Sequence, residues 1–179
     1  MRDTGRNFQS QRFLNIRDKF MKAKEAYENA KETYENAKEA YQYALNINAP
    51  FPEGEAVIAK NAQYSLAYAR NVLREPFPEG EKIIATDAEF SYYYAREILR
   101  KPFPEGEAAI ANSTVYSFYY AINILKAPFP KGEYAISKNK IFYYDYAINI
   151  LKTPLASIIK ETDENVKYYN DSTKEFFKH

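Results

Sequence analysis

Residues 76–81 read Pro-Phe-Pro-Glu-Gly-Glu, and nearly the same string recurs at 26-residue steps along the chain. The prolines that open it are Pro50, Pro76, Pro102, Pro128 and Pro154. The first three units carry the full string, the fourth has Lys131 in place of a glutamate, and the fifth has lost it. A fixed period of this length indicates stacked supersecondary units, each of which buries an apolar face on the next.

Each unit predicts two helices joined by a turn. In the unit that begins at Pro50, Pro52 suits a first helical position, and Glu53 and Glu55 follow in the first turn, where the helix dipole favours negative charge. A second helix is expected to begin at a position that always holds a strong N-cap residue. These residues are Asn61, Asp87, Ser113 and Asn139.

The second helix of each unit carries a constant apolar face. In the first unit its members are Tyr64, Tyr68, Ala69, Val72 and Leu73, whose spacing fits one side of a helix. The chain has no Trp but 18 Tyr and 12 Phe, so aromatic rings replace leucine in the expected core. Tyrosine suits a thin core, because its ring can be buried while its hydroxyl reaches water at the edge.

Residues 24–44 contain three nearly identical heptads, and no Gly or Pro interrupts residues 6–49. The pattern predicts one long helix with a narrow apolar seam that continues into the array of units. The seam can cover the first unit as an N-terminal cap, or it can form a coiled coil with another copy or a partner. The predicted oligomerisation residues are Phe13, Ile16, Phe20, Tyr27, Tyr34 and Tyr41.

Together these patterns predict an all-α fold, a solenoid of helix–turn–helix repeats preceded by one long heptad-patterned helix. The expected organisation is a long N-terminal helix over 1–48, four helical-hairpin repeats over 49–153, and a degenerate C-terminal capping repeat over 154–179.

Composition excludes several classes of protein. The net charge of +1 gives no overall attraction to nucleic acid or membrane, and the absence of cysteine excludes disulfides and thiolate chemistry. No apolar run reaches the length of a membrane span, and the first residues contain no apolar signal-peptide stretch. We therefore expect no membrane partner and a cytoplasmic location.

No catalytic signature, phosphate-cradling glycine loop or metal-binding motif occurs, and the one histidine, His179, is expected to be solvated. We expect no enzymatic activity, no metal site and no cofactor. The recurring glutamates can act as acids or bases, but their helix-start positions favour a structural role. A basic column of Arg74, Arg100, Lys126 and Lys152 can complement helix C-termini or follow a phosphate backbone.

Columns that vary between units are candidates for specificity, because stacking explains only the constant ones. Tyr and Arg are favoured at binding hot spots, and aromatic rings with Arg can also stack bases. The alternative is that the varied rings pack on a neighbouring unit. The predicted partner-binding residues are Arg70, Tyr92, Tyr93, Arg96, Arg100, Phe118 and Tyr119.

The strings Pro-Phe-Pro-Glu-Gly-Glu and Tyr-Ala-Arg-Glu-Ile-Leu-Arg (94–100) resemble a family of short helical repeats in proteins of large tailed bacteriophages and giant viruses. The resemblance covers about residues 50–160 and excludes the heptad segment. It implies a viral origin and an infected host cell as the location, and it implies no enzymatic activity.

Three functions follow from these patterns. The leading hypothesis is a phage factor that binds and blocks a host protein, such as an anti-phage defence protein, and that self-associates through its N-terminal helix. The alternatives are a nucleic-acid-binding helical array and an oligomeric sponge that sequesters a small nucleotide.

Overall fold

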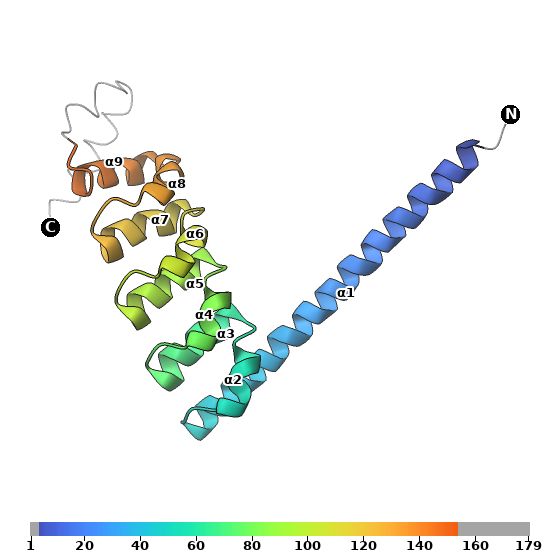
Figure 1. Ribbon diagram of the computed structural model, residues 1–179, viewed down its shortest axis with the longest axis horizontal. Coiled ribbons are helices and arrows are strands. Elements are labelled where there is room, and N and C mark those ends of the chain that lie inside the picture. The colour runs from blue at the N-terminus through green and yellow to red at the C-terminus, as the bar shows by residue number, and fades with distance from the viewer. Residues whose placement is uncertain (1–3, 154–179) are drawn as a thin grey trace.

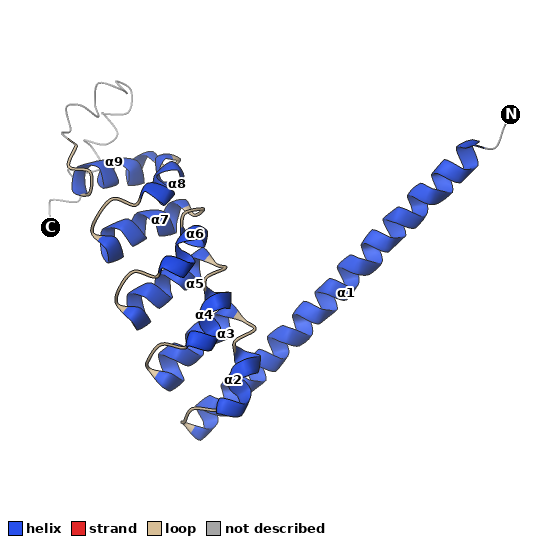
Figure 2. Ribbon diagram, viewed as in Figure 1, coloured by secondary structure: helices blue, strands red, loops and turns tan. Residues whose placement is uncertain are grey.

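The computed structural model describes residues 4–153, and within the long first helix the side chains of residues 4–20, 23, 26, 27, 30 and 34 are not described. Helices and short loops make up this part of the chain, which contains no strand (Figure 2). The all-α prediction is therefore confirmed for residues 4–153. The predicted capping repeat over 154–179 lies outside the described residues.

Helix α1 (Thr4–Ile47) is followed by four helix pairs in chain order (Figure 1). The first helices of the pairs are α2 (Pro52–Ile58), α4 (Pro78–Ile84), α6 (Glu107–Ile110) and α8 (Glu133–Ser137), with the 3₁₀ turns η3 (Pro104–Gly106) and η5 (Pro130–Gly132) before the last two. The second helices are α3 (Ala62–Tyr68), α5 (Ala88–Tyr93), α7 (Thr114–Tyr120) and α9 (Lys140–Asn149). The second helices α3, α5 and α7 each contact the first and second helices of the next pair.

The predicted N-caps are confirmed in all four second helices. Asp87 accepts backbone N–H hydrogen bonds from Glu89 and Phe90, at 2.9 and 3.0 Å. The side chains of Asn61, Ser113 and Asn139 accept equivalent bonds. Because these caps satisfy amides that a helix start leaves free, they fix where each second helix begins.

A tyrosine joins the two helices of each pair. The Tyr94 hydroxyl accepts the backbone N–H of Phe77 at 2.9 Å and donates to Glu81 Oε1 at 2.8 Å. The same pair of bonds recurs at Tyr68, Tyr120 and Tyr146. These four side chains are fully buried, so the expectation that tyrosine hydroxyls reach water at the edge is wrong for this column.

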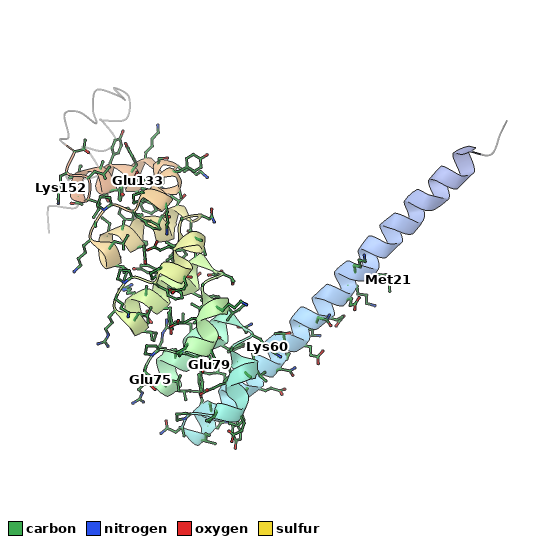
Figure 3. The ribbon with its side chains drawn as sticks, in the orientation of Figure 1. Met21, Lys60, Glu75, Glu79, Glu133 and Lys152 are labelled. Atoms are coloured by element: carbon green, nitrogen blue, oxygen red, sulfur yellow. The ribbon has the colours of Figure 1, made fainter. Side chains whose placement is uncertain are left out.

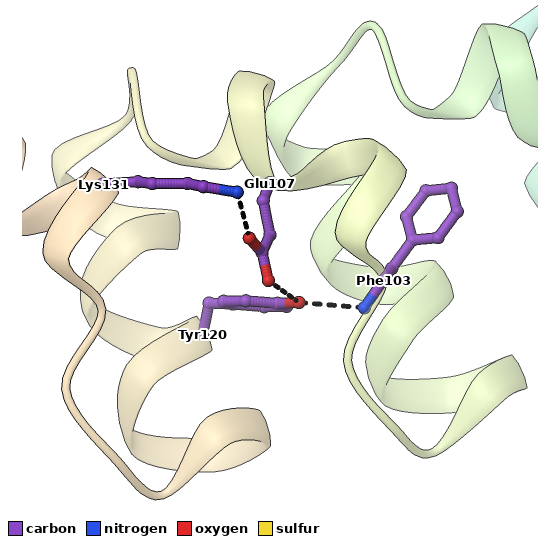
Figure 4. A network of polar contacts seen from close by, with 4 residues as sticks. All are labelled: Phe103, Glu107, Tyr120 and Lys131. Carbon is purple, nitrogen blue, oxygen red and sulfur yellow. Dashed lines mark hydrogen bonds and ion pairs between the residues drawn. The ribbon is translucent and has the colours of Figure 1, made fainter.

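The fourth unit differs from the others at Lys131, and the structure gives this difference a role. Lys131 Nζ lies 2.8 Å from Glu107 Oε2, whereas the other oxygen of the same carboxylate accepts from Tyr120 at 3.3 Å (Figure 4). The lysine therefore connects the fourth unit to the third across the interface between them. The Glu107–Tyr120 bond is longer than its counterparts in the other units.

Neighbouring units approach closely where a glycine meets a serine. A Cβ atom on Gly106 would lie 2.5 Å from Ser91 Oγ, and a Cβ atom on Gly80 would lie 2.7 Å from Ser65 Cβ. The serine hydroxyl at this contact is hydrogen-bonded within its own unit, since Ser91 donates to the carbonyl of Ile84 at 3.0 Å. In the fourth unit an exposed tyrosine, Tyr143, occupies the position that serine holds in the first three.

The second helices end in π-helical segments in three of the four pairs: η1 (Ala69–Leu73), η2 (Tyr94–Leu99) and η4 (Ala121–Leu125). Five residue steps separate Ala69 from Arg74, the residue with positive φ that ends this helix, but only four separate Ala44 from the equivalent Asn48 in α1. A π turn accommodates one residue more than an α turn. The end of α1 is therefore one residue shorter than the equivalent part of a repeat, because it lacks the extra residue of the π segment.

Helix α1 joins the array through its C-terminal end and otherwise extends away from it (Figure 1). Ala37 and Ala44 are fully buried. Ala40 lies 3.3 Å from a Cβ atom built on Gly54, so it occupies the position against the glycine that Ser65 and Ser91 occupy in the following units. This end of the seam caps the first unit. None of the helices within residues 4–153 is both long and apolar enough to span a membrane.

Candidate protein-binding surface

One side of the second helices is exposed or half-buried, although some of its side chains also contact a neighbouring unit, as Tyr93 contacts Tyr116. In the second unit its members are Glu89 and Tyr93 on α5, Arg96 on η2, and Arg100 directly after η2. We call this surface the outer face. Its other members are Gln63, Ala67, Arg70 and Arg74; Val115, Tyr119, Ile122 and Lys126; and Ile141, Asp145, Ile148 and Lys152.

Two predicted partner-binding residues, Tyr92 and Phe118, do not belong to the outer face. Tyr92 is only 3 % exposed, packs 5.7 Å from the Tyr116 ring and accepts a hydrogen bond from Asn123 Nδ2. Phe118 is 8 % exposed and stacks on Phe142 with ring centroids 4.6 Å apart. Both rings hold neighbouring units together, which corrects their assignment to a partner-binding surface.

The other five predicted residues lie on the outer face. Tyr119 is 40 % exposed and Tyr93 is half-buried. Arg70 pairs with Glu97 of the next unit at 2.6 Å, so part of its charge serves stacking. Arg96 lies 6.0 Å above the Tyr92 ring and, like Arg100, is exposed.

The sequence interpretation missed the apolar end of this surface. Val115 is 43 % exposed and Ile141 is 51 % exposed, and half-buried Ile122 and Ile148 lie seven residues further along the same helices. Burial raises the pKa of the Asp145 carboxyl above its usual value, as expected for an acid on this apolar part of the face. The signal was present in the column Gln63, Glu89, Val115 and Ile141, which turns from polar to apolar along the array.

The predicted oligomerisation seam is only partly described. Tyr41 packs 5.7 Å from the Tyr64 ring and accepts a hydrogen bond from Asn71 Nδ2 at 2.7 Å, so it serves the contact between α1 and the first unit. This contact favours the capping interpretation for that residue. The side chains of Phe13, Ile16, Phe20, Tyr27 and Tyr34 lie outside the described set.

The described residues contain no candidate metal centre. No group of three or more His, Cys, Asp or Glu side chains within that set is placed to hold a metal ion. A shallow, open depression between the starts of α3 and α5 is lined by Lys60, Gln63, Asp87 and Phe90, among others. The Asp87 carboxylate there is already engaged as an N-cap.

No protein-family model matches the chain, and no similar curated protein or solved structure was found. The resemblance to viral helical repeats therefore rests on the repeat strings, and the outer face has to be interpreted from its own chemistry.

Proposed function

We propose that this chain is a non-enzymatic solenoid protein that binds a protein partner through its outer face. The observation that carries the proposal is the exposure of Val115, Tyr119 and Ile141 on the second helices. Contacts between units account for these side chains only in part: the Tyr119 ring contacts Tyr92 and Phe142 of the neighbouring units, with centroids 6.2 and 6.0 Å away, yet 40 % of the residue stays exposed. Exposed aromatic and apolar side chains beside arginines are the usual composition of a binding hot spot.

The proposed mechanism is simple occupation of a partner surface. The array is stiffened by the buried tyrosine bonds and by the glycine–serine contacts, so little ordering is needed on binding. The resemblance to repeats of bacteriophages and giant viruses favours a host protein as the partner and its blockage as the result. Self-association through the part of α1 that extends away from the array would present two outer faces and raise avidity.

Replacing Tyr119 and Ile141 together by serine should abolish selection of binders from a random-peptide display library. Removing two exposed hot-spot side chains typically lowers the affinity tenfold or more. A tenfold loss corresponds to about 1.4 kcal/mol of binding free energy. The matched control is Tyr134→Ser, because Tyr134 is 77 % exposed on α8 and does not belong to the outer face. Equal enrichment by the double variant and the wild type would contradict the proposal.

A further inference from the structure

Four second helices end on a residue with positive φ, and none of the four is glycine. The φ values are 59° at Arg74, 54° at Arg100, 51° at Lys126 and 56° at Lys152. Glycine is strongly preferred at this position, because a Cβ atom is penalised in the left-handed region. Asn48 fills the equivalent position in α1 with φ 51°, and asparagine is the usual second choice.

Stability alone does not explain the four basic residues. A cation near a helix C-terminus is stabilised by the helix dipole, but at an exposed position this gain is smaller than the left-handed penalty. All four side chains are exposed, and none forms an ion pair or side-chain hydrogen bond with another described residue. By contrast, Arg70 and Lys131 do form ion pairs between units.

The four cations border the outer face along one edge. Each is the residue with positive φ that ends its second helix, so the four lie at the same end of the second helices. Figure 3 shows Glu75, next to Arg74, and Lys152 at the edge where the second helices end, away from Lys60 at the opposite edge. One cation per unit therefore lies at this edge of the outer face, and Lys126 and Lys152 belong to the two units that carry its apolar end. Packed helices lie about 8–10 Å apart, which sets the approximate spacing of the row.

We infer that the occupant of the outer face is an acidic amphipathic segment of a protein partner. This inference rests on the proposed function and adds the chemistry of the partner. The apolar side chains of the segment pack on Val115, Tyr119 and Ile141, and its carboxylates pair with Arg100, Lys126 and their equivalents. Aliphatic Val and Ile side chains suit a protein segment better than a nucleic acid, whose bases stack on aromatic rings.

The test compares three proteins with the wild type in the same peptide-display selection. One variant replaces Arg74, Arg100, Lys126 and Lys152 by glycine, a second replaces the same four by glutamine, and Asn48→Gly is the matched control without a charge change. We expect the wild type and the control to enrich peptides that combine Asp or Glu with apolar residues. Both fourfold variants should lose the acidic enrichment, and a synthetic peptide from the wild-type pool should bind them at least about tenfold more weakly.

Thermal unfolding separates this loss from a folding defect. The glycine variant should have a higher Tm than the wild type and the glutamine variant, because glycine relieves four left-handed positions. A fourfold glycine variant that is more stable but binds less well would support a recognition role for the cations.

Three results would overturn the inference. The first is a wild-type pool without acidic enrichment. The second is equal peptide affinity for the wild type and both fourfold variants. The third is displacement of the bound peptide by duplex DNA at a lower concentration than unlabelled peptide requires. If the Tyr119→Ser/Ile141→Ser variant loses binding while the fourfold variants retain it, only this inference fails. If no variant changes the selection, the proposed function fails as well.

Discussion

Gly106→Val should lower the free energy of unfolding by about 3 kcal/mol, a loss at the upper end of the range for overpacked cores. A Cβ atom at residue 106 would lie 2.5 Å from Ser91 Oγ and 2.6 Å from Phe103 Cδ1. Ser91 is fully buried and belongs to the preceding unit, so the added methyl groups can be accommodated only by separating the two units. Urea unfolding followed by circular dichroism measures the change.

The matched control for this substitution is Ala108→Val, at an exposed position of α6, which begins directly after Gly106. It should change the free energy of unfolding by less than about 0.5 kcal/mol, as is usual for surface positions. Adding Ser91→Gly to Gly106→Val should restore part of the lost stability, because one of the two close contacts is then removed. Equal urea midpoints for Gly106→Val and Ala108→Val would show that the units do not approach each other as closely as described.

Local rules were sufficient to predict the helix starts. Pro78 at a first helical position and Asp87 at an N-cap depend on backbone groups within a few residues, and the structure confirms both. The repeat period then extended each assignment to the other units. This is why the element order could be predicted from the sequence.

Contacts between units could not be predicted in the same way. The glycine at 106 was visible in the repeat string, but its partner Ser91 lies in the preceding unit and is identified only once the helices are packed. The prediction for the tyrosine hydroxyls was wrong although their contact lies within one unit, because it too forms only once the two helices of the pair are packed. The Phe77 amide that binds Tyr94 is seventeen residues away, and no helical spacing links the two.

The candidate site shows how adjacent residues of one helix can differ in burial. Tyr92 and Tyr93 are adjacent, and both vary between units, yet Tyr92 is buried against the next unit while Tyr93 lies on the outer face. The rotation of the second helix relative to its neighbour separates them. That rotation depends on packing at the Ser91–Gly106 contact and is not encoded in the helical period alone.

Raising the pH from 10 to 12 should unfold the array cooperatively. Burial, with added contributions from the partner glutamates, raises the pKa of Tyr68, Tyr120 and Tyr146 from 10.0 to about 12, and raises that of Tyr94 further. Above pH 10 the unfolded chain therefore binds fewer protons than the folded chain, and the free energy of unfolding falls as pH rises. Two pKa units correspond to about 2.7 kcal/mol for each tyrosine. Four such groups approach the 5–15 kcal/mol stability typical of a domain.

Ultraviolet absorbance of tyrosinate and far-ultraviolet circular dichroism, recorded on the same samples, test this expectation. Part of the tyrosinate signal should appear together with the loss of helix, because the buried hydroxyls ionise only when the array opens. Tyr94→Phe should be less stable at neutral pH by about 1–3 kcal/mol, since the Phe77 amide and Glu81 lose their partner. Its stability should also fall less steeply with pH, by about 1.4 kcal/mol per pH unit between 10 and 12, because one linked proton is gone. An unchanged slope in this variant would mean that the buried tyrosine column does not control alkaline unfolding, and that the bonds joining the helix pairs contribute less than their geometry indicates.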